Sequence, residues 1–103
     1  MTPTKTLKET VSLMLSDDPI DQFKAEYYQL ENRFITLNEM LTEWDVGRLN
    51  PVPPVSRYLY GETFGHMRNY LQSLTKIAAA LGVDLSGNDT TEVDGNDDSA
   101  GAG

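Results

Sequence analysis

The chain has 103 residues, of which 39% are hydrophobic and 23% are charged, with no cysteine and a formal net charge of −8. This length fits one small domain and is too short for two, and the composition excludes both a membrane protein and a wholly disordered chain. The lack of cysteine excludes disulfides and thiolate chemistry and fits a reducing cytosol. The N-terminal residues lack the apolar core and cleavage site of a secretory signal, so we expect a cytoplasmic protein.

The negative charge is concentrated at the C-terminus. Residues 84–103 hold six of the 16 acidic residues and no lysine or arginine, whereas residues 1–83 hold ten acidic and eight basic residues, a net charge of −2. Avid binding of nucleic acid needs a basic face that neutralises phosphates, and this body has no such excess of positive charge. We therefore expect no direct nucleic-acid partner. No apolar run approaches the roughly 20 residues that span a bilayer, so we expect no membrane partner either.

The first predicted element is a short helix over residues 4–16. Its apolar residues recur at helical spacing: Leu7, Val11, Met14 and Leu15. Thr2 or Thr4 is a candidate N-cap. The helix ends at residues 16–19, where Asp17 or Asp18 can cap the next helix with Pro19 in its first turn.

The second predicted helix covers residues 19–46 and carries the strongest periodic signal. Its apolar residues are spaced alternately by three and four positions: Ile20, Phe23, Tyr27, Leu30, Phe34, Leu37, Leu41 and Trp44. This spacing is typical of a coiled-coil seam. Tyr28, Ile35 and Met40 form a second apolar stripe beside the seam, and Gly47 supplies the left-handed residue that ends the helix.

A proline-rich connector, residues 47–56, precedes a third predicted helix over residues 57–81, with Ser56 as its cap. The third helix has a matching stripe: Tyr60, Phe64, Met67, Leu71, Leu74, Ala78 and Leu81. Gly82 ends it, and Val83 can fold back in a Schellman contact. Gly61 and Gly65 weaken helix propensity by about 1 kcal/mol each, which leaves the start of this helix open.

These elements predict an all-α fold: an antiparallel two-helix hairpin with a short N-terminal helix, forming one helical domain over residues 1–85. Residues 86–103 contain one large apolar side chain, Val93, among Gly, Asp, Asn and Ser. Such a segment cannot offset the entropy of ordering, so we predict a disordered acidic tail.

The hairpin has more apolar surface than two helices can bury against each other. We predict a homo-oligomer, a dimer or higher, because a body this small has a limited core. The predicted interface consists of Tyr28, Ile35, Met40, Tyr70 and Ile77. A monomeric three-helix unit with some exposed apolar surface is the alternative.

The sequence contains none of the common enzymatic or phosphate-binding motifs. Its single histidine, His66, has no aspartate, cysteine or second histidine near it in sequence, so we expect neither a catalytic group nor a metal site. Glu39 and Glu43 lie one helical turn apart, but such pairs are ordinary on a solvated helix face. We predict that the protein is not an enzyme and has no cofactor.

Tyrosines and arginines recur together in the second and third helices. Tyrosine offers a stacking face and a hydroxyl, and arginine a bidentate fork for phosphate, which suits a nucleotide-like ligand or a protein interface. The candidate ligand- or partner-binding residues are Arg57, Tyr58, Arg68, Tyr28, Arg33 and Arg48. In the alternative interpretation these tyrosines are core or flank residues with hydroxyls at the rim.

A family resemblance covers roughly residues 4–85. It is carried by residues 21–33, DQFKAEYYQLENR, by the proline-bearing connector, by residues 67–74, MRNYLQSL, and by the ending GVDL at residues 82–85. These segments resemble a family of small helical proteins of tailed phages and prophages of gut bacteria, labelled as crAss-like-phage-related. The resemblance implies a phage origin and no activity or site residues.

Three functions follow as hypotheses. The first is a non-enzymatic phage accessory protein acting by binding in the host bacterial cytoplasm, against host defence, by sequestering a nucleotide-like signal or blocking a defence protein. The second is an acidic DNA mimic, which the net charge favours and its position in the tail disfavours. The third is a structural or assembly component of the virion.

Overall fold

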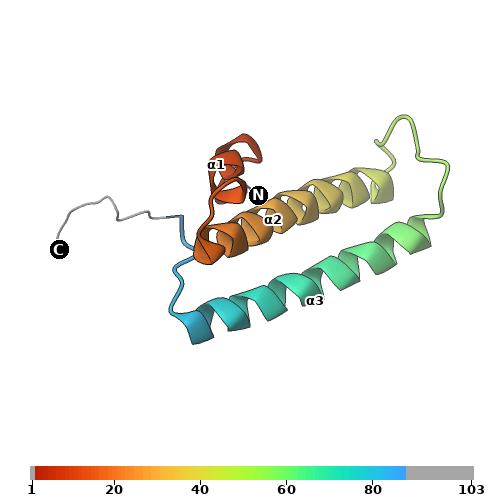
Figure 1. Ribbon diagram of the computed structural model, residues 1–103. Coiled ribbons are helices and arrows are strands. Elements are labelled where there is room, and N and C mark those ends of the chain that lie inside the picture. The colour runs from red at the N-terminus through yellow and green to blue at the C-terminus, as the bar shows by residue number, and fades with distance from the viewer. Residues whose placement is uncertain (1, 88–103) are drawn as a thin grey trace.

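The computed structural model describes residues 2–87, and all regular structure in that range is helical, which confirms the all-α prediction. The elements are a 3₁₀ turn η1 (Lys8–Thr10), α1 (Val11–Met14), α2 (Pro19–Asp45) and α3 (Arg57–Leu81). The two long helices run side by side in opposite directions, and the N-terminal segment lies against α2 on the side away from α3 (Figure 1). The molecule is elongated, 49 × 23 × 23 Å. No helix of residues 2–87 is long and apolar enough to cross a membrane.

The ends of α2 follow from its flanking residues. The Asp18 carboxylate accepts a hydrogen bond from the backbone N–H of Ile20 at 2.9 Å, and Pro19 occupies the first helical position, where a missing N–H costs nothing. Gly47 adopts φ 77° after the last turn, and the Arg48 N–H donates back to the carbonyl of Glu43 at 2.8 Å. The predicted cap and the predicted stop of this helix are both confirmed.

The helix α3 starts at Arg57 and runs unbroken through both of its glycines. Ser56 caps it by accepting a hydrogen bond from the Tyr58 N–H at 3.1 Å. Gly82 ends it with φ 72°, and the Val83 N–H donates to the carbonyl of Ala78 at 2.8 Å, which is the predicted Schellman bond.

The interface between α2 and α3 is built from the two predicted stripes. Leu41, Leu74 and Ala78 are buried, and the rings of Phe34 and Phe64 stack with centroids 4.4 Å apart. Toward the connector, the rings of Trp44 and Tyr60 lie 6.0 Å apart. Offset or tilted aromatic pairs of this kind add to the stabilisation that burial itself gives.

The N-terminal segment is shorter in helix than predicted. Instead of a helix over residues 4–16, helical structure begins at Lys8 and ends at Met14. Thr6 and Glu9, rather than Thr2 or Thr4, make the reciprocal capping bonds: the Thr6 N–H donates to Glu9 Oε1 at 2.8 Å, and the Glu9 N–H donates to Thr6 Oγ1 at 3.2 Å. The hydrogen bond from the Thr6 N–H is the main reason that the pKa of the Glu9 carboxyl lies below its usual value. Residues 2–5 are not helical. The side-chain amide of Asn32 in α2 donates a hydrogen bond to the Lys5 carbonyl, so this carbonyl has a partner without a helix.

Two residues that the sequence assigned to an oligomer interface are buried within one copy. Tyr28 is 1% exposed, with the Lys5 ammonium 5.8 Å from its ring centroid and the Tyr27 ring 5.6 Å away. Ile35 is also buried. The assignment of Tyr28 and Ile35 to an interface between copies is therefore corrected: both side chains are buried inside one copy. Of the other predicted interface residues, Met40 is half-buried, and Tyr70 and Ile77 are exposed.

The predicted disordered tail falls almost wholly outside the described residues, which stop at Gly87. The last described residues are Ser86 and Gly87, and the Ser86 N–H donates to the Asp84 carboxylate at 2.9 Å. That bond holds the pKa of Asp84 below its usual range.

Candidate functional site

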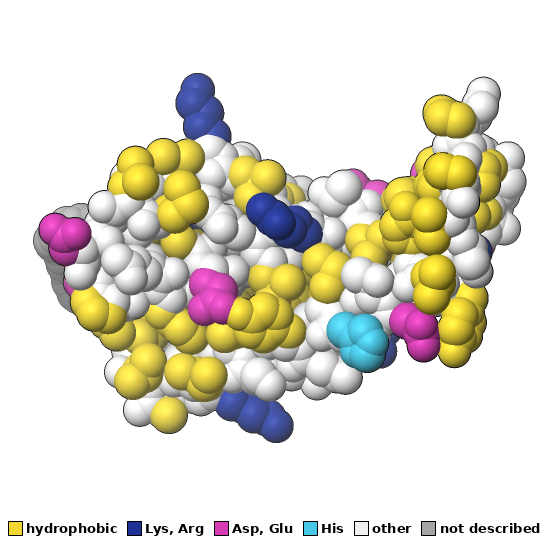
Figure 2. Space-filling model, turned by 45° about the vertical axis from the view of Figure 1, so that its right-hand side comes forward, with side chains coloured by type: hydrophobic (Ala, Val, Ile, Leu, Met, Phe, Trp, Pro, Cys, Tyr) yellow, Lys and Arg dark blue, Asp and Glu magenta, His cyan; other side chains and the backbone are white. Residues whose placement is uncertain are grey.

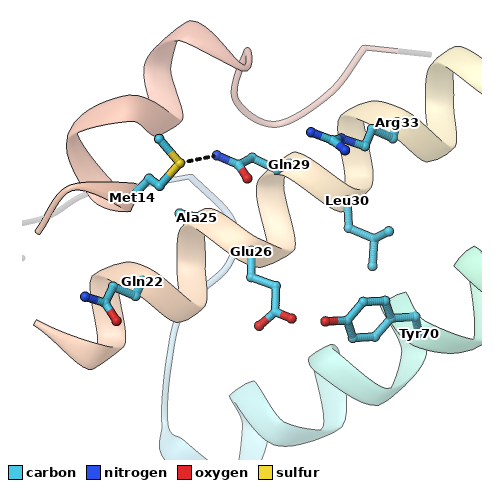
Figure 3. Close-up of a pocket in the computed structure, with 8 residues that line it drawn as sticks. All are labelled: Met14, Gln22, Ala25, Glu26, Gln29, Leu30, Arg33 and Tyr70. Atoms are coloured by element: carbon cyan, nitrogen blue, oxygen red, sulfur yellow. Dashed lines mark hydrogen bonds between the residues drawn. The ribbon is translucent and has the colours of Figure 1, made fainter.

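A groove of about 440 Å³ runs along α2, with the N-terminal segment at one edge and α3 at the other. Figure 3 shows side chains from all three segments converging on it. Its lining consists of Met14, Gln22, Ala25, Glu26, Gln29, Leu30, Arg33 and Tyr70. The volume falls within the range of natural small-molecule sites, roughly 300–1,000 Å³.

The groove follows one side of α2 because its polar residues alternate in spacing between three and four positions, as the apolar seam residues do. Gln22, Glu26, Gln29 and Arg33 recur at intervals of four, three and four residues, so they share a face. Leu30 lies beside them and points toward α3, from which Tyr70 reaches across the groove with its hydroxyl facing Glu26 (Figure 3). Met14 closes the groove from the N-terminal segment.

The two glutamines of the groove have their donors in use. The Gln29 amide nitrogen lies 3.1 Å from Thr10 Oγ1 and 3.5 Å from the sulfur of Met14, and the Gln22 amide nitrogen donates to the carbonyl of Ser16 at 2.7 Å. These bonds fix both side chains and orient the amides. Their amide oxygens are left as acceptors, since these bonds use only the nitrogens.

The two charged residues of the groove are not paired within residues 2–87. Neither Glu26 nor Arg33 forms an ion pair or a side-chain hydrogen bond there. They are seven residues apart on α2, about 10 Å along the helix axis. The groove thus has an acceptor-rich end at Glu26 and a cationic end at Arg33, with Leu30 between them on α2, Met14 on the N-terminal side and the Tyr70 ring on the α3 side (Figure 3).

The connector end of the molecule holds two other predicted site residues, Arg48 and Arg57, far from this groove along the helices. Arg48 pairs with Glu43 at 2.9 Å, and both Nε and Nη2 of Arg57 donate to the Asp45 carboxylate at 3.0 Å. The hydrogen bonds from these arginines lower the pKa values of Glu43 and Asp45. The two guanidinium forks are therefore already engaged with carboxylates.

The remaining predicted residues are also separate from the groove. Tyr58 is 70% exposed at the start of α3, the Arg68 guanidinium lies over the Phe64 ring at 5.3 Å from its centroid, and Tyr28 is buried. Of the six candidate ligand-binding residues, only Arg33 lines the groove. The prediction had placed Tyr70 in an interface and had not singled out Glu26, Gln22 or Gln29. The signal that could have found them is their own helical spacing beside the seam.

Nothing in the described part of the chain groups three or more metal-ligating side chains of the His, Cys, Asp or Glu type. The groove offers one carboxylate, amide oxygens, a guanidinium and a phenol, which is a set suited to an organic ligand. An apolar lining with a few placed polar groups is the usual make-up of such a site.

A family model matches the chain, as a comparison with known proteins shows. No curated protein and no solved structure matches the chain. The model of the family described as Sequestin matches residues 17–76, more than half of the chain, from the cap of α2 through most of α3. That range includes all of the groove's lining except Met14. The family name is consistent with a binding or sequestering role, and the phage-related label expected from the sequence stays a prediction. The chain belongs to the Sequestin family.

Proposed function

We propose that this protein acts by binding rather than by catalysis, and that it sequesters a nucleotide-like signal in the groove between the N-terminal segment, α2 and α3. The observation that carries the proposal is the meeting of Arg33 and Tyr70 in one groove of ligand size. A sequestering role is also what the family name suggests.

The groove matches the chemistry of a nucleotide in three respects. The Arg33 guanidinium is a planar fork that binds phosphate in a bidentate manner. The Tyr70 ring, with Leu30 and Met14, forms an apolar surface on which a base can stack. Glu26 and the amide oxygens of Gln22 and Gln29 accept hydrogen bonds from amino groups or ribose hydroxyls.

The biological setting of the proposal is the cytoplasm of a bacterial host, where a phage or prophage protein would remove a defence signal. The sequence resemblance to phage proteins supports this setting. A protein that blocks a host defence protein is the close alternative, and a virion component is a further one. A DNA mimic is less well supported, because a mimic needs acidic residues on a rigid face and five of the 16 lie beyond the described residues.

The test is native mass spectrometry of the protein purified directly from its host, followed by titration with a panel of linear and cyclic mono- and dinucleotides. We expect a retained adduct of nucleotide mass, or binding to at least one member of the panel. Arg33→Ala is expected to weaken that binding roughly tenfold or more, since a hydrogen bond to a charged group is worth about 1.5–3 kcal/mol.

Arg68→Ala is the matched control, because it removes the same charge from α3 at a position outside the groove. If nucleotide binding is unchanged in Arg33→Ala but lost in Arg68→Ala, the binding site is not this groove. Absence of any adduct and of any binding across the panel would reject nucleotide sequestration and direct the search to a host protein.

A further inference from the structure

The side of α3 that borders the groove carries an apolar stripe that residues 2–87 leave about half exposed. Its four large side chains are all exposed: Leu59 (50%), Tyr70 (44%), Ile77 (46%) and Leu81 (55%). They share one face of the helix, because separations of seven and eleven residues correspond to whole turns. Figure 2 shows hydrophobic side chains reaching the surface at both ends and at the middle of the molecule.

The two ends of the stripe are symmetric about Tyr70. Leu59 precedes Tyr70 by eleven residues and Leu81 follows it by eleven, while Thr63 and Ile77 lie seven residues to either side. Tyr70 is also within one residue of the middle of α3, which spans Arg57–Leu81. A helix with this symmetry can pack antiparallel against its own copy with every residue of the stripe in contact, as a two-fold interface requires.

The charges beside the stripe have the same symmetry. Glu62 lies eight residues before Tyr70 and Lys76 six residues after it, on the same flank of α3. In an antiparallel pair about Tyr70, Glu62 of one copy therefore lies about 3 Å along the axis from the level of the partner's Lys76. Neither residue has an ion pair inside the described chain. Opposite charges at flanking positions of this kind set helix orientation and register.

The stripe is long enough for a helix pair, because Leu59 and Leu81 are 22 residues apart, about 33 Å along the helix axis. The same face includes the mouth of the groove, because Tyr70 belongs both to the stripe and to the groove lining. A second copy seated on the stripe therefore reaches the groove as well.

From these observations we infer that two copies of the chain pack α3 against α3 antiparallel with Tyr70 at the two-fold axis, and that the partner's Tyr70 completes each groove. This inference rests on the proposed function for the identity of the ligand, but not for the pairing itself. The partner's Tyr70 adds a second aromatic surface beside the ligand. Closing the groove in this way also removes water from around Arg33, which strengthens its interaction with an anion.

Because the chain has no native cysteine, the pairing can be tested by single-cysteine cross-linking of the full chain. Tyr70→Cys is expected to form a disulfide-linked dimer under mild oxidation. Gln72→Cys is the matched control, since this exposed residue lies two positions away and more than a quarter turn from the stripe. A mixture of Leu59→Cys and Leu81→Cys chains should give the mixed disulfide, with much less of either homodimer.

Sedimentation of the unmodified chain supplies the second measurement. A dimer in solution, with cross-linking confined to Tyr70→Cys and the mixed pair, supports the inference whether or not any nucleotide binds. A monomer at about 100 μM, or equal cross-linking of Gln72→Cys, overturns it. A monomer that still binds a nucleotide overturns the pairing alone and leaves the proposed function standing. A dimer whose nucleotide affinity does not fall on dilution into the monomer range overturns the contribution of the partner's Tyr70.

Discussion

Gly65 in the middle of α3 is the position where a single methyl group should stabilise the protein most simply. Its φ is not positive, and a Cβ added there meets no other atom within 4 Å. Alanine is favoured over glycine inside a helix by about 0.5–1 kcal/mol, because glycine loses more backbone entropy on folding. Gly65→Ala is therefore expected to stabilise the fold by that amount. For a domain of this size the melting temperature should rise by about 2–8 °C.

Gly61 provides the matched comparison, because it lies one turn earlier in the same helix and differs in its surroundings. A Cβ at Gly61 would lie 2.9 Å from Nη1 of Arg57, whose guanidinium is held over the glycine by Asp45. The substitution has the same gain in helix propensity, but the arginine must shift away from its partner. Gly61→Ala is expected to give a smaller increase in melting temperature than Gly65→Ala.

Asp45→Asn separates the two effects in a double-mutant cycle. Once the ion pair is gone, Arg57 can move without loss, and Gly61→Ala should then stabilise as much as Gly65→Ala. Thermal melts followed by far-UV circular dichroism at neutral pH would measure all the variants. The reasoning is refuted if Gly65→Ala lowers the melting temperature, or if Gly61→Ala and Gly65→Ala have equal effects both with and without Asp45.

Three further predictions concern the caps, the buried hydroxyl and the ion pair. Asp18→Ala should cost about 1 kcal/mol in urea unfolding, because it removes the acceptor for the first turn of α2. Thr10→Val keeps nearly the same side-chain shape and should lower the free energy of unfolding by about 1–3 kcal/mol, because the fully buried Thr10 hydroxyl donates to the Leu7 carbonyl and accepts from the Gln29 amide. Ser12→Ala, at an exposed position of α1, is the control and should change the free energy of unfolding little. The lowered pKa of Asp45 means that its ion pair stabilises the fold above the usual aspartate pKa and is lost as the pH falls through the lowered value. Asp45→Asn should therefore reduce the slope of stability against pH in the acidic range, and an unchanged slope would contradict the assignment.

The two long helices could be predicted from sequence almost to the residue because their ends are decided locally. Asp18 with Pro19, Ser56, and the glycines at 47 and 82 each satisfy or release backbone groups within one turn. Such signals do not depend on what the helix packs against. The stripe spacing then fixes which faces of α2 and α3 meet.

The N-terminal segment could not be predicted in the same way, because a tertiary contact decides its conformation. Periodicity alone favours a helix from residue 4, yet the backbone of Thr4 and Lys5 is bonded by Glu31 and Asn32 of α2 instead. The same contact explains the misplaced interface. The sequence shows that Tyr28 is on an apolar stripe, but it does not show whether the chain's own N-terminus or another copy covers that stripe.

The groove was beyond sequence reasoning for a related reason. Its members Met14, Arg33 and Tyr70 come from three segments, and their meeting depends on how the N-terminal segment crosses α2. The arginines near the connector were better candidates by composition, because proline-rich loops leave residue identity less constrained by packing. In the structure their forks are occupied by neighbouring carboxylates, which a one-dimensional pattern does not reveal.

The near-neutral body has a consequence for how a sequestering protein of this kind would hold its ligand. With a net charge of −2 over residues 1–83, long-range attraction of an anionic signal is weak, so association gains little from electrostatic steering. Affinity must then come from burial of the base and from one desolvated arginine per groove. Pairing of two copies would supply that burial. Because the pair forms by mass action, binding would strengthen as the protein accumulates. A protein that must outnumber its signal to remove it would thus bind most tightly at the copy number where it acts.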